Sequence, residues 1–317
     1  MYSIAIIGAG NMGAFYDSPQ SPYILSHAHA FCAHPEFNLV GFVDSNGAQA
    51  QKAAGIWGGR GYESVEELFK VEQVDGMVIA VADGGHFDVF KTVTSFPIRF
   101  ICLEKPIALK IDQARSMVEL AEQKQITVLV NYSRRYLTDY VRLKENIQAG
   151  VHGRFLGGTG LYGKGLIHNG SHMLDLLLYF FGIPEVDSKR HALIDFSSQD
   201  PTWSALLRWG EEAYFNLMGM DSREFTIFEI DLLFSRGRVH IQNSGGRIDI
   251  YGVEESSLYS GYKNLAKTQE LQVDLAQSLP SLANNLYDTL QNKSQPRCTL
   301  EDGFRVLSLC LSIREGE

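Results

Sequence analysis

The stretch Ile4-Ala5-Ile6-Ile7-Gly8-Ala9-Gly10-Asn11-Met12-Gly13 decides the fold of the first part of this 317-residue chain. Its first four residues are apolar and indicate a short buried strand, and three glycines then follow in a G-x-G-x-x-G pattern. Such glycines let the chain turn tightly and let a pyrophosphate approach backbone N–H groups at the start of a helix. Because the pattern follows a strand, it predicts a dinucleotide-binding Rossmann domain.

Asp44 stands at the end of the next predicted strand, after Val40-Gly41-Phe42-Val43. Its carboxylate would accept hydrogen bonds from ribose hydroxyls, and its charge would repel a 2′-phosphate. We therefore expect NAD as the cofactor, with NADP as the second possibility. A helix N-cap is the alternative role for this aspartate. The cofactor-binding residues predicted in these two segments are Gly8, Gly10, Asn11, Met12, Gly13 and Asp44.

The distance along the chain from Gly13 to Asp44 is longer than the spacing of about 20 residues usual for this fingerprint. Two prolines three residues apart, in Asp17-Ser18-Pro19-Gln20-Ser21-Pro22, cannot continue a helix. We therefore expect an inserted loop at this point.

The rest of the chain predicts two domains. Short apolar runs alternate with helical stretches up to about residue 131, which is typical of a doubly wound parallel sheet; the predicted strands are 3–7, 39–43, 76–81, 99–103 and 127–130. Later extended runs are separated by short turns such as Ser244-Gly245-Gly246, which favours antiparallel pairing. The expected fold is an α/β Rossmann domain over residues 1–132 followed by an α+β domain with a large open antiparallel sheet over 133–317.

Composition and charge argue against several classes of partner. The formal net charge is -9 and basic residues do not cluster, so we expect neither nucleic acid nor an anionic membrane as a partner. The apolar stretch 173–183 is interrupted by Asp175 and is too short to span a bilayer. The four cysteines are widely spaced without a C-x-x-C pair, so we expect reduced thiols, no zinc site and a cytoplasmic protein.

Glu104-Lys105-Pro106 follows the predicted strand 99–103, at the edge of the sheet where ligands bind in open α/β folds. Lys105 would there face the nicotinamide, where desolvation and a cationic ring would lower the pKa of its ammonium group. It could then accept a proton or donate a hydrogen bond. The alternative is an ordinary solvated surface charge.

A second group of polar residues lies in His168-Asn169-Gly170-Ser171-His172-Met173-Leu174-Asp175. In a helix starting near Gly170, His172 and Asp175 share one face, so His172 could act as acid or base while Asp175 orients its imidazole. One alternative is a buried histidine–aspartate pair that serves only packing. Another is a metal site formed by His168, His172 and Asp175, which no cysteine pattern supports, so we expect no metal.

Four segments together resemble the Gfo/Idh/MocA oxidoreductase family, named for glucose-fructose oxidoreductase and inositol dehydrogenase. They are Gly8–Gly13, Glu104-Lys105-Pro106, Asn131–Tyr136 and Asn169–Asp175, and the resemblance spans nearly the whole chain. It implies a Rossmann domain followed by a domain whose open antiparallel sheet often mediates dimers or tetramers. It also implies NAD(P)-linked oxidation or reduction of sugars, nucleotide sugars or cyclitols.

By this resemblance, Lys105 matches the lysine that contacts the reacting hydroxyl, and His172 matches the histidine used in proton transfer. Many members carry an aspartate where this chain has His168, so the proton relay here differs or His168 lines the substrate pocket. Glu104 and Lys105 are also predicted to contact the cofactor. The remaining predicted substrate contacts are Tyr132, Arg135, Tyr162, Lys164, His168 and Asp175.

These features lead to a mechanistic hypothesis. A secondary sugar hydroxyl lies between His172 and Lys105; His172 removes its proton while hydride leaves to NAD, and Lys105 stabilises the developing alkoxide. Two other functions stay open: an NAD-dependent glycosidase that acts by transient oxidation and elimination, and a non-catalytic regulator that senses NAD or sugar. The expected partners are a small sugar-like substrate and further copies of the chain in a homodimer or homotetramer.

Overall fold

The computed structural model describes residues 1–315, which form two compact units. Unit 1 consists of residues 1–136 and 276–307, and unit 2 consists of residues 137–275 and the segment from 308 onward. The expected boundary at residue 132 lies four residues before the observed one. The expected division also assigned the whole carboxyl-terminal part to the second domain, whereas residues 276–307 pack with the first. A sequence pattern cannot show this return of the chain, because it depends on contacts between distant segments.

The sheet of unit 1 contains six parallel strands in the order β3-β2-β1-β4-β5-β6. They are β1 (Tyr2–Ile7), β2 (Phe37–Val43), β3 (Arg60–Tyr62), β4 (Gly76–Ile79), β5 (Phe100–Leu103) and β6 (Thr127–Val130). This strand order is that of the doubly wound Rossmann sheet, which confirms the predicted fold. β3 was not predicted, because three residues without a buried apolar side chain give no strand pattern.

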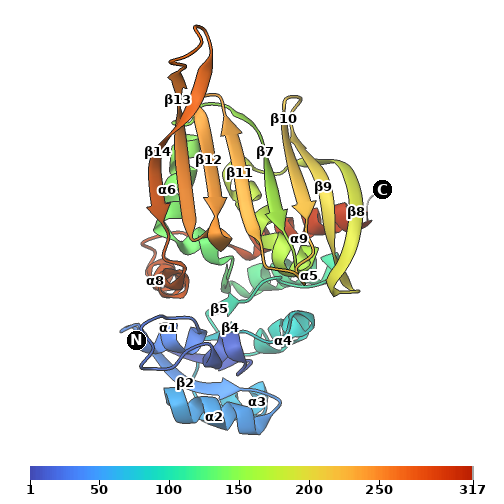
Figure 1. Ribbon diagram of the computed structural model, residues 1–317. Helices are drawn as coiled ribbons and strands as arrows, with labels where there is room; N and C mark the ends of the chain where they lie inside the picture. Colours follow the sequence, from blue (N-terminus) through green and yellow to red (C-terminus); the bar gives the residue numbers. More distant parts are fainter. Residues whose placement is uncertain (316–317) are drawn as a thin grey trace. The chain divides into compact units, whose positions relative to one another are not determined.

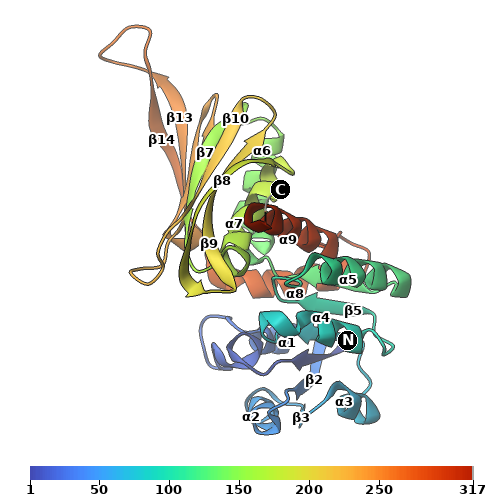
Figure 2. The same cartoon turned by 90° about the vertical axis from the view of Figure 1, so that its right-hand side faces the viewer.

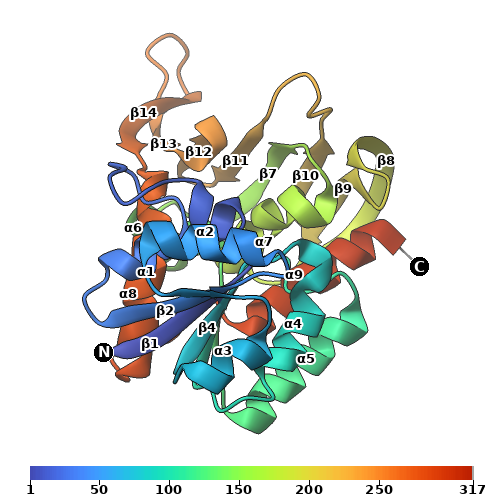
Figure 3. The same ribbon diagram turned by 90° about the horizontal axis from the view of Figure 1, so that it is seen from below.

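Helices cover both faces of this sheet. Figure 3 shows α1 (His27–Ala33) and α2 (Gly47–Trp57) on one face, and α3 (Val65–Val71), α4 (His86–Val93) and α5 (Ile111–Lys124) on the other. α8 (Ser278–Leu290) packs beside α1, and α9 (Leu300–Glu315) begins in this unit. Single turns complete it: η1 (Asn11–Phe15), η2 (Asp83–Gly85), η3 (Ser133–Tyr136) and η6 (Leu275–Gln277), the last of which starts one residue before the unit.

The helix after the glycine-rich loop differs from the prediction. The segment after Gly10 forms only the single turn η1, and α1 starts at His27 rather than near Tyr23. The inserted loop is closed by Asp17, whose carboxylate accepts hydrogen bonds from the N–H groups of Leu25 at 2.6 Å and Ser26 at 3.3 Å. Ser26 is the N-cap of α1. The cap and the buried carboxylate therefore fix where the helix begins.

The sheet of unit 2 contains eight strands in the order β14-β13-β12-β11-β7-β10-β9-β8 (Figure 1). They are β7 (Phe155–Tyr162), β8 (Glu185–Ser197), β9 (Asp200–Trp209), β10 (Ala213–Gly219), β11 (Phe228–Phe234), β12 (Gly237–Gln242), β13 (Arg247–Glu255) and β14 (Lys263–Gln272). Neighbouring strands are antiparallel except β7 and β10, which run parallel. The sheet is therefore mixed rather than purely antiparallel.

One face of this sheet is covered by helices of unit 2. Figure 2 shows α6 (Thr138–Gln148) and α7 (Ser171–Phe181) on the same face, and the turns η4 (Leu166–Gly170) and η5 (Asn243–Gly245) belong to the same unit. Gly160 of β7 lies against Met173 of α7, so closely that a Cβ there would overlap the methionine sulfur. Within residues 1–315, no helix is long and apolar enough to cross a membrane.

Candidate active site

The glycine-rich loop lies at the carboxyl ends of β1, β2 and β4. Gly8 has a φ of +93° and its N–H donates to the carbonyl of Val43 at 2.8 Å. A Cβ on Gly8 would lie 2.5 Å from the carbonyl oxygen of Ala80. Only glycine fits this conformation and this close approach of two strand ends.

Asp44 is tied to this loop by its side chain. One carboxylate oxygen accepts a hydrogen bond from the N–H of Ala9 at 2.9 Å, and the other accepts one from Asn46 at 2.9 Å. The N-cap residue of α2 is Asn46, so the alternative N-cap role of Asp44 is not the one observed. A carboxylate has about four lone-pair sites, so Asp44 keeps acceptor capacity for a ribose.

A cavity of about 500 Å³ opens beside these residues, within unit 1. Three of its lining residues are acids, Asp44, Glu63 and Asp88, and the others include Ile7, Gly8, Gly10, Val43, Ser45, Gln49, Ala80, Val81 and Ala82. A glycine-lined floor, an acceptor for a diol and apolar walls suit the adenosine half of a dinucleotide. The residues present therefore fit the predicted cofactor.

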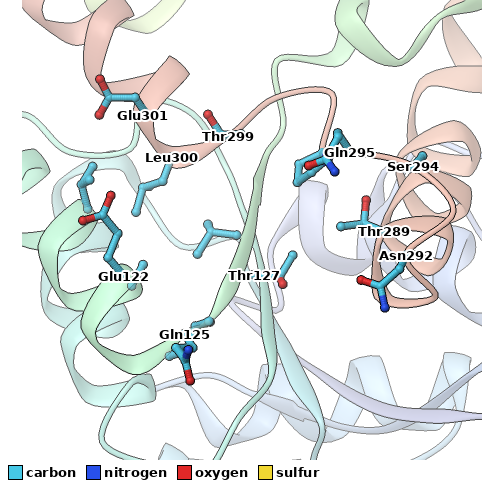
Figure 4. A pocket seen from close by; sticks show the side chains of 15 residues that line it. Glu122, Gln125, Thr127, Thr289, Asn292, Ser294, Gln295, Thr299, Leu300 and Glu301 are labelled. Carbon is cyan, nitrogen blue, oxygen red and sulfur yellow. The ribbon is translucent and has the colours of Figure 1, made fainter.

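A second cavity of unit 1, of about 480 Å³, lies away from these strand ends. Figure 4 shows its side chains, among them Glu122 and Gln125 at the end of α5, Thr127 at the start of β6, and Thr289 at the end of α8. Thr127 is the first residue of its strand, so this cavity lies toward the amino ends of the strands. Open α/β sheets bind their ligands at the opposite, carboxyl edge.

Glu104 follows β5 directly, and its side chain is buried. Its Oε1 atom lies 2.8 Å from Nε2 of His27 and accepts a hydrogen bond from the Asn131 amide at 2.7 Å. Burial opposes ionisation of Glu104, but the bonds from His27 and Asn131 and the charge of Lys105 together hold its pKa below the usual value. The Glu104 carboxylate is therefore hydrogen-bonded to other side chains of unit 1, and these bonds fix its position. Its predicted contact with the cofactor stays a prediction.

Lys105 comes next in the chain and is half-buried. The electrostatic attraction between its ammonium group and the Glu104 carboxylate acts on both partners. A charged ammonium group is a strong hydrogen-bond donor for an alkoxide.

Two of the predicted substrate contacts, Tyr132 and Arg135, are buried in unit 1. The Arg135 guanidinium lies 3.2 Å from the carboxylate of Asp302. Burial opposes ionisation of Asp302, but Arg135 and the N–H of Thr299 hold its pKa below the usual value. Arg135 therefore holds the start of α9 in place, and its predicted contact with the substrate stays a prediction.

The loop between β7 and α7 carries two other predicted contacts, Lys164 and His168, and the β8–β9 hairpin holds its backbone. Asp195 accepts the N–H of Lys164 at 2.7 Å, and Asp200 accepts those of Ile167 at 2.9 Å and His168 at 2.8 Å. Burial raises the pKa of Asp200, although these N–H groups and His168 oppose the shift. The position of His168 is thus set by a carboxylate on a neighbouring strand.

An aromatic side chain completes this loop. The ring of Phe196 on β8 stacks on the His168 imidazole, with centroids 4.7 Å apart and planes 21° from parallel. The Lys164 ammonium lies 5.6 Å from the centroid of the same ring. The structure thus brings Lys164 and His168 together around Phe196, which is itself 48% exposed.

α7 carries His172 and Asp175 three residues apart, as predicted, with His172 half-buried and Asp175 buried. Tyr162 is also buried, and its hydroxyl donates to the carbonyl of Trp203 at 2.7 Å and accepts the N–H of the same residue at 3.0 Å. These bonds give Tyr162 a structural role, and its predicted contact with the substrate stays a prediction. Tyr162 thus joins β7 to β9.

Several residues of these sites gave no signal in the sequence. His27 and His86 of unit 1, and Asp195, Phe196 and Asp200 of unit 2, stand outside recognisable motifs and contact the predicted site residues of their own unit through long-range contacts. Of the residues that the structure describes, no three His, Cys, Asp or Glu side chains are arranged to hold a metal ion.

Comparison with known proteins supports this assignment of unit 1. Residues 2–132 match the Gfo/Idh/MocA family, described as an oxidoreductase family with an NAD-binding Rossmann fold. The rhizopine catabolism protein MocA of Rhizobium meliloti is 24% identical over 152 residues, which is 48% of this chain and 44% of that protein. The D-glucoside 3-dehydrogenase of Escherichia coli (strain K12) is 26% identical over 205 residues, 58% of this chain and 55% of that protein.

Among solved structures, the WlbA dehydrogenase from Bordetella pertussis in complex with NADH and UDP-GlcNAcA is similar over 100% of this chain and 96% of its own. The TM-score is 0.81 at 19% sequence identity, which shows a common fold. The chain spans about half the length of the curated relatives it matches. Residues 2–132 are thus similar to the NAD-binding Rossmann domain of the Gfo/Idh/MocA oxidoreductase family, and the similarity of the whole chain to solved structures shows a common fold.

Proposed function

We propose that the chain is an NAD-dependent dehydrogenase or reductase that acts on a secondary hydroxyl of a sugar, nucleotide sugar or cyclitol. The observation that carries this proposal is the arrangement of strand ends in unit 1. Gly8 and Asp44 line a cavity suited to the adenosine half of a dinucleotide at the carboxyl ends of β1 and β2, and Lys105 follows the carboxyl end of β5 in the same sheet. Bound NAD supplies the hydride acceptor, and NADH the hydride donor in the reverse direction.

Lys105 is the proposed electrophilic group. Its ammonium group donates a hydrogen bond to the reacting oxygen. This bond strengthens as negative charge develops on the oxygen during removal of hydride. Glu104 itself stays ionised and bonded to His27 and Asn131, so it stabilises Lys105 without touching the substrate.

His172 is the proposed general base. An imidazole is the side chain most often used to accept a hydroxyl proton near neutral pH. It stands in the first turn of α7, and Asp175, one helical turn further along, is the proposed partner that orients its imidazole. Lys164 and His168, held by the β8–β9 hairpin, are the proposed substrate contacts of this unit.

The test uses Lys105→Met and His172→Ala in the full-length protein. NADH formation is measured with methyl glucoside, glucose 6-phosphate, myo-inositol and UDP-N-acetylglucosamine. We expect each variant to lose turnover by a factor of about 100 to 10,000, with NAD affinity kept within threefold. Lys110→Met, which alters an exposed lysine of unit 1, and His240→Ala on β12 are the matched controls. Full turnover in both active-site variants would overturn the proposal.

The same assay separates the other candidate functions. Cleavage of an aryl glycoside without accumulation of NADH identifies a glycosidase that oxidises its substrate only transiently. Binding of NAD and of a sugar, without turnover in either assay, identifies a regulator.

We further propose that the chain forms a homodimer or homotetramer through the face of the unit 2 sheet that α6 and α7 leave open. Tyr214, Met218 and Leu233 are between 37% and 42% exposed, and they alternate along their strands with residues buried on the helical face. Light scattering after gel filtration gives the subunit number. A monomer at micromolar concentration would contradict this proposal.

A further inference from the structure

Lys105 stands between two residues that are each held by a buried histidine. The carboxylate of Glu104 bonds to Nε2 of His27 at 2.8 Å, and the carbonyl oxygen of Pro106 lies 2.6 Å from Nδ1 of His86. Both imidazoles are fully buried. We propose that His27 and His86 are positioning residues that hold Lys105 for the reaction, an inference that rests on the proposed role of Lys105.

His86 is the first residue of α4 and bonds through both ring nitrogens. Nδ1 faces the carbonyl of Pro106, and Nε2 faces the carbonyl of Val81 at 3.0 Å. A carbonyl oxygen can only accept a hydrogen bond, so the ring nitrogen that carries a hydrogen donates to the carbonyl it faces, and the ring is packed between both carbonyls. The imidazole then links the chain after β4 to the chain after β5.

This link connects Lys105 to the cofactor cavity. Val81 lines that cavity, and the neighbouring Ala80 lies so close to Gly8 that no side chain fits between them. Because β4 and β5 are adjacent in the sheet, a ring bonded to both strand ends fixes their spacing. His86 therefore sets the segment that carries Lys105 relative to the wall of the cavity.

His27 holds the other side of Lys105 through Glu104. It is the first residue of α1, whose start is fixed by the Ser26 cap and by the Asp17 carboxylate, which also bonds to His29 at 2.8 Å. The inserted loop thus fixes the position of His27, whose ring bonds to Glu104 directly after β5. Asn131, after β6, bonds to the same oxygen of Glu104, so two further chain segments hold this carboxylate.

Lys105 needs a fixed backbone because of the flexibility of its own side chain. A lysine side chain has a long flexible stem, so its ammonium group is placed well only if its backbone is fixed. A displacement of about 1 Å at a catalytic group can cost a hundredfold in rate. The buried rings of His27 and His86 contact the residues on either side of Lys105, and they supply this restraint without contacting the substrate.

Paired amide substitutions test the proposal, because an Asn amide nitrogen takes the place of Nδ1 and a Gln amide nitrogen takes the place of Nε2. His86→Asn keeps the bond to Pro106, whereas His86→Gln keeps only the bond to Val81. At the other position the pattern reverses: His27→Gln keeps the bond to Glu104, and His27→Asn loses it. Each pair keeps an amide, so both members suffer a similar general loss of packing.

We expect kcat to fall by a factor of about ten to a hundred in His86→Gln and His27→Asn, and to stay within threefold in His86→Asn and His27→Gln. NAD affinity, measured by fluorescence titration, stays within threefold in all four variants. Equal kcat within each pair would overturn the proposal, and so would a loss that follows the melting temperature instead of the retained bond.

A second comparison uses the Lys105→Met background. If His86 acts through Lys105, His86→Gln slows the Lys105→Met variant by less than twofold, because the group it positions is gone. A further tenfold loss would show that His86 acts independently and would overturn the inference. Full turnover in Lys105→Met alone contradicts the proposed function instead, so the two failures are distinguishable.

A readout without turnover accompanies these assays. Reductive methylation with ¹³C-formaldehyde labels the lysines, and the NMR signal absent from Lys105→Met belongs to Lys105. We expect this signal to move in His86→Gln and to stay in place in His86→Asn. An unchanged signal in both variants would contradict a positioning role.

Discussion

The carboxylate of Asp44 accepts a hydrogen bond from the backbone N–H of Ala9 at 2.9 Å, which ties the end of β2 to the glycine-rich loop after β1. One side chain therefore shapes the loop and presents negative charge to the cavity beside it. Glu63 and Asp88 line the same cavity and add to that charge. This arrangement favours a ribose hydroxyl over a 2′-phosphate.

The first prediction concerns cofactor preference. Asp44→Asn keeps an oxygen acceptor for Ala9 and removes the charge, so the affinity for NADP relative to NAD should rise by about tenfold. Fluorescence titration with both cofactors measures this ratio. Asp187→Asn, on β8 of unit 2, is a control that should leave the ratio unchanged. A falling ratio in Asp44→Asn would contradict the proposed role of the charge.

The second prediction separates a structural from a substrate-binding role for Tyr162. Tyr162→Phe leaves the buried N–H and carbonyl groups of Trp203 without their side-chain partner, so the free energy of unfolding should fall by about 1–3 kcal/mol. KM should stay within twofold, because the tyrosine is fully buried. Urea unfolding and steady-state kinetics give the two values. A raised KM with unchanged stability would restore the substrate contact.

The third prediction concerns Arg135 and the pH dependence of stability. In the wild type the pKa of Asp302 is lowered, so the pair stabilises the fold above the ordinary Asp pKa and this contribution is lost as pH falls through the lowered value. Arg135→Met leaves the partly buried carboxylate without its cation and should cost about 2–3 kcal/mol at pH 7.

The difference in unfolding free energy between Arg135→Met and the wild type should shrink as pH falls from 7 through the ordinary Asp pKa toward the lowered pKa of Asp302, because the unfolded chains and the folded variant take up a proton first and the folded wild type last. Urea titrations at three pH values measure it. A difference that grows in acid would contradict the assignment.

The fourth prediction concerns the loop that carries His168. Asp200→Ala removes the acceptor for the N–H groups of Ile167 and His168, so the loop loses its anchor to β9. We expect kcat/KM to fall by about tenfold or more, with unchanged NAD affinity. Asp231→Ala on β11 removes a carboxylate from the same sheet as a control. A loss of equal size in both variants would indicate a general effect on the sheet.

The elements that could be predicted from the sequence are those with a local signature. The strands β1, β2, β4, β5 and β6 could be predicted because each is a short run of apolar residues buried on both faces of the sheet. The loop Gly8–Gly13 could be predicted because its glycines permit a tight turn. Both signals lie within a single segment of the sequence. The polar edge strand β14 and the short strand β3 lack such a signature, so they were missed.

The site divides in the same way. The sequence by itself determined the cofactor loop with Asp44, the resemblance to the Gfo/Idh/MocA family, and Lys105 and His172 as candidate groups, because these stand in motifs of fixed spacing. Only the tertiary structure decided that Arg135 pairs with Asp302, that Tyr162 bonds to Trp203, and that Asp200 holds His168. It also decided that His27 and His86 flank Lys105. The physical reason is that a buried polar group takes the partner that packing brings within 3 Å, and that partner lies far away along the chain.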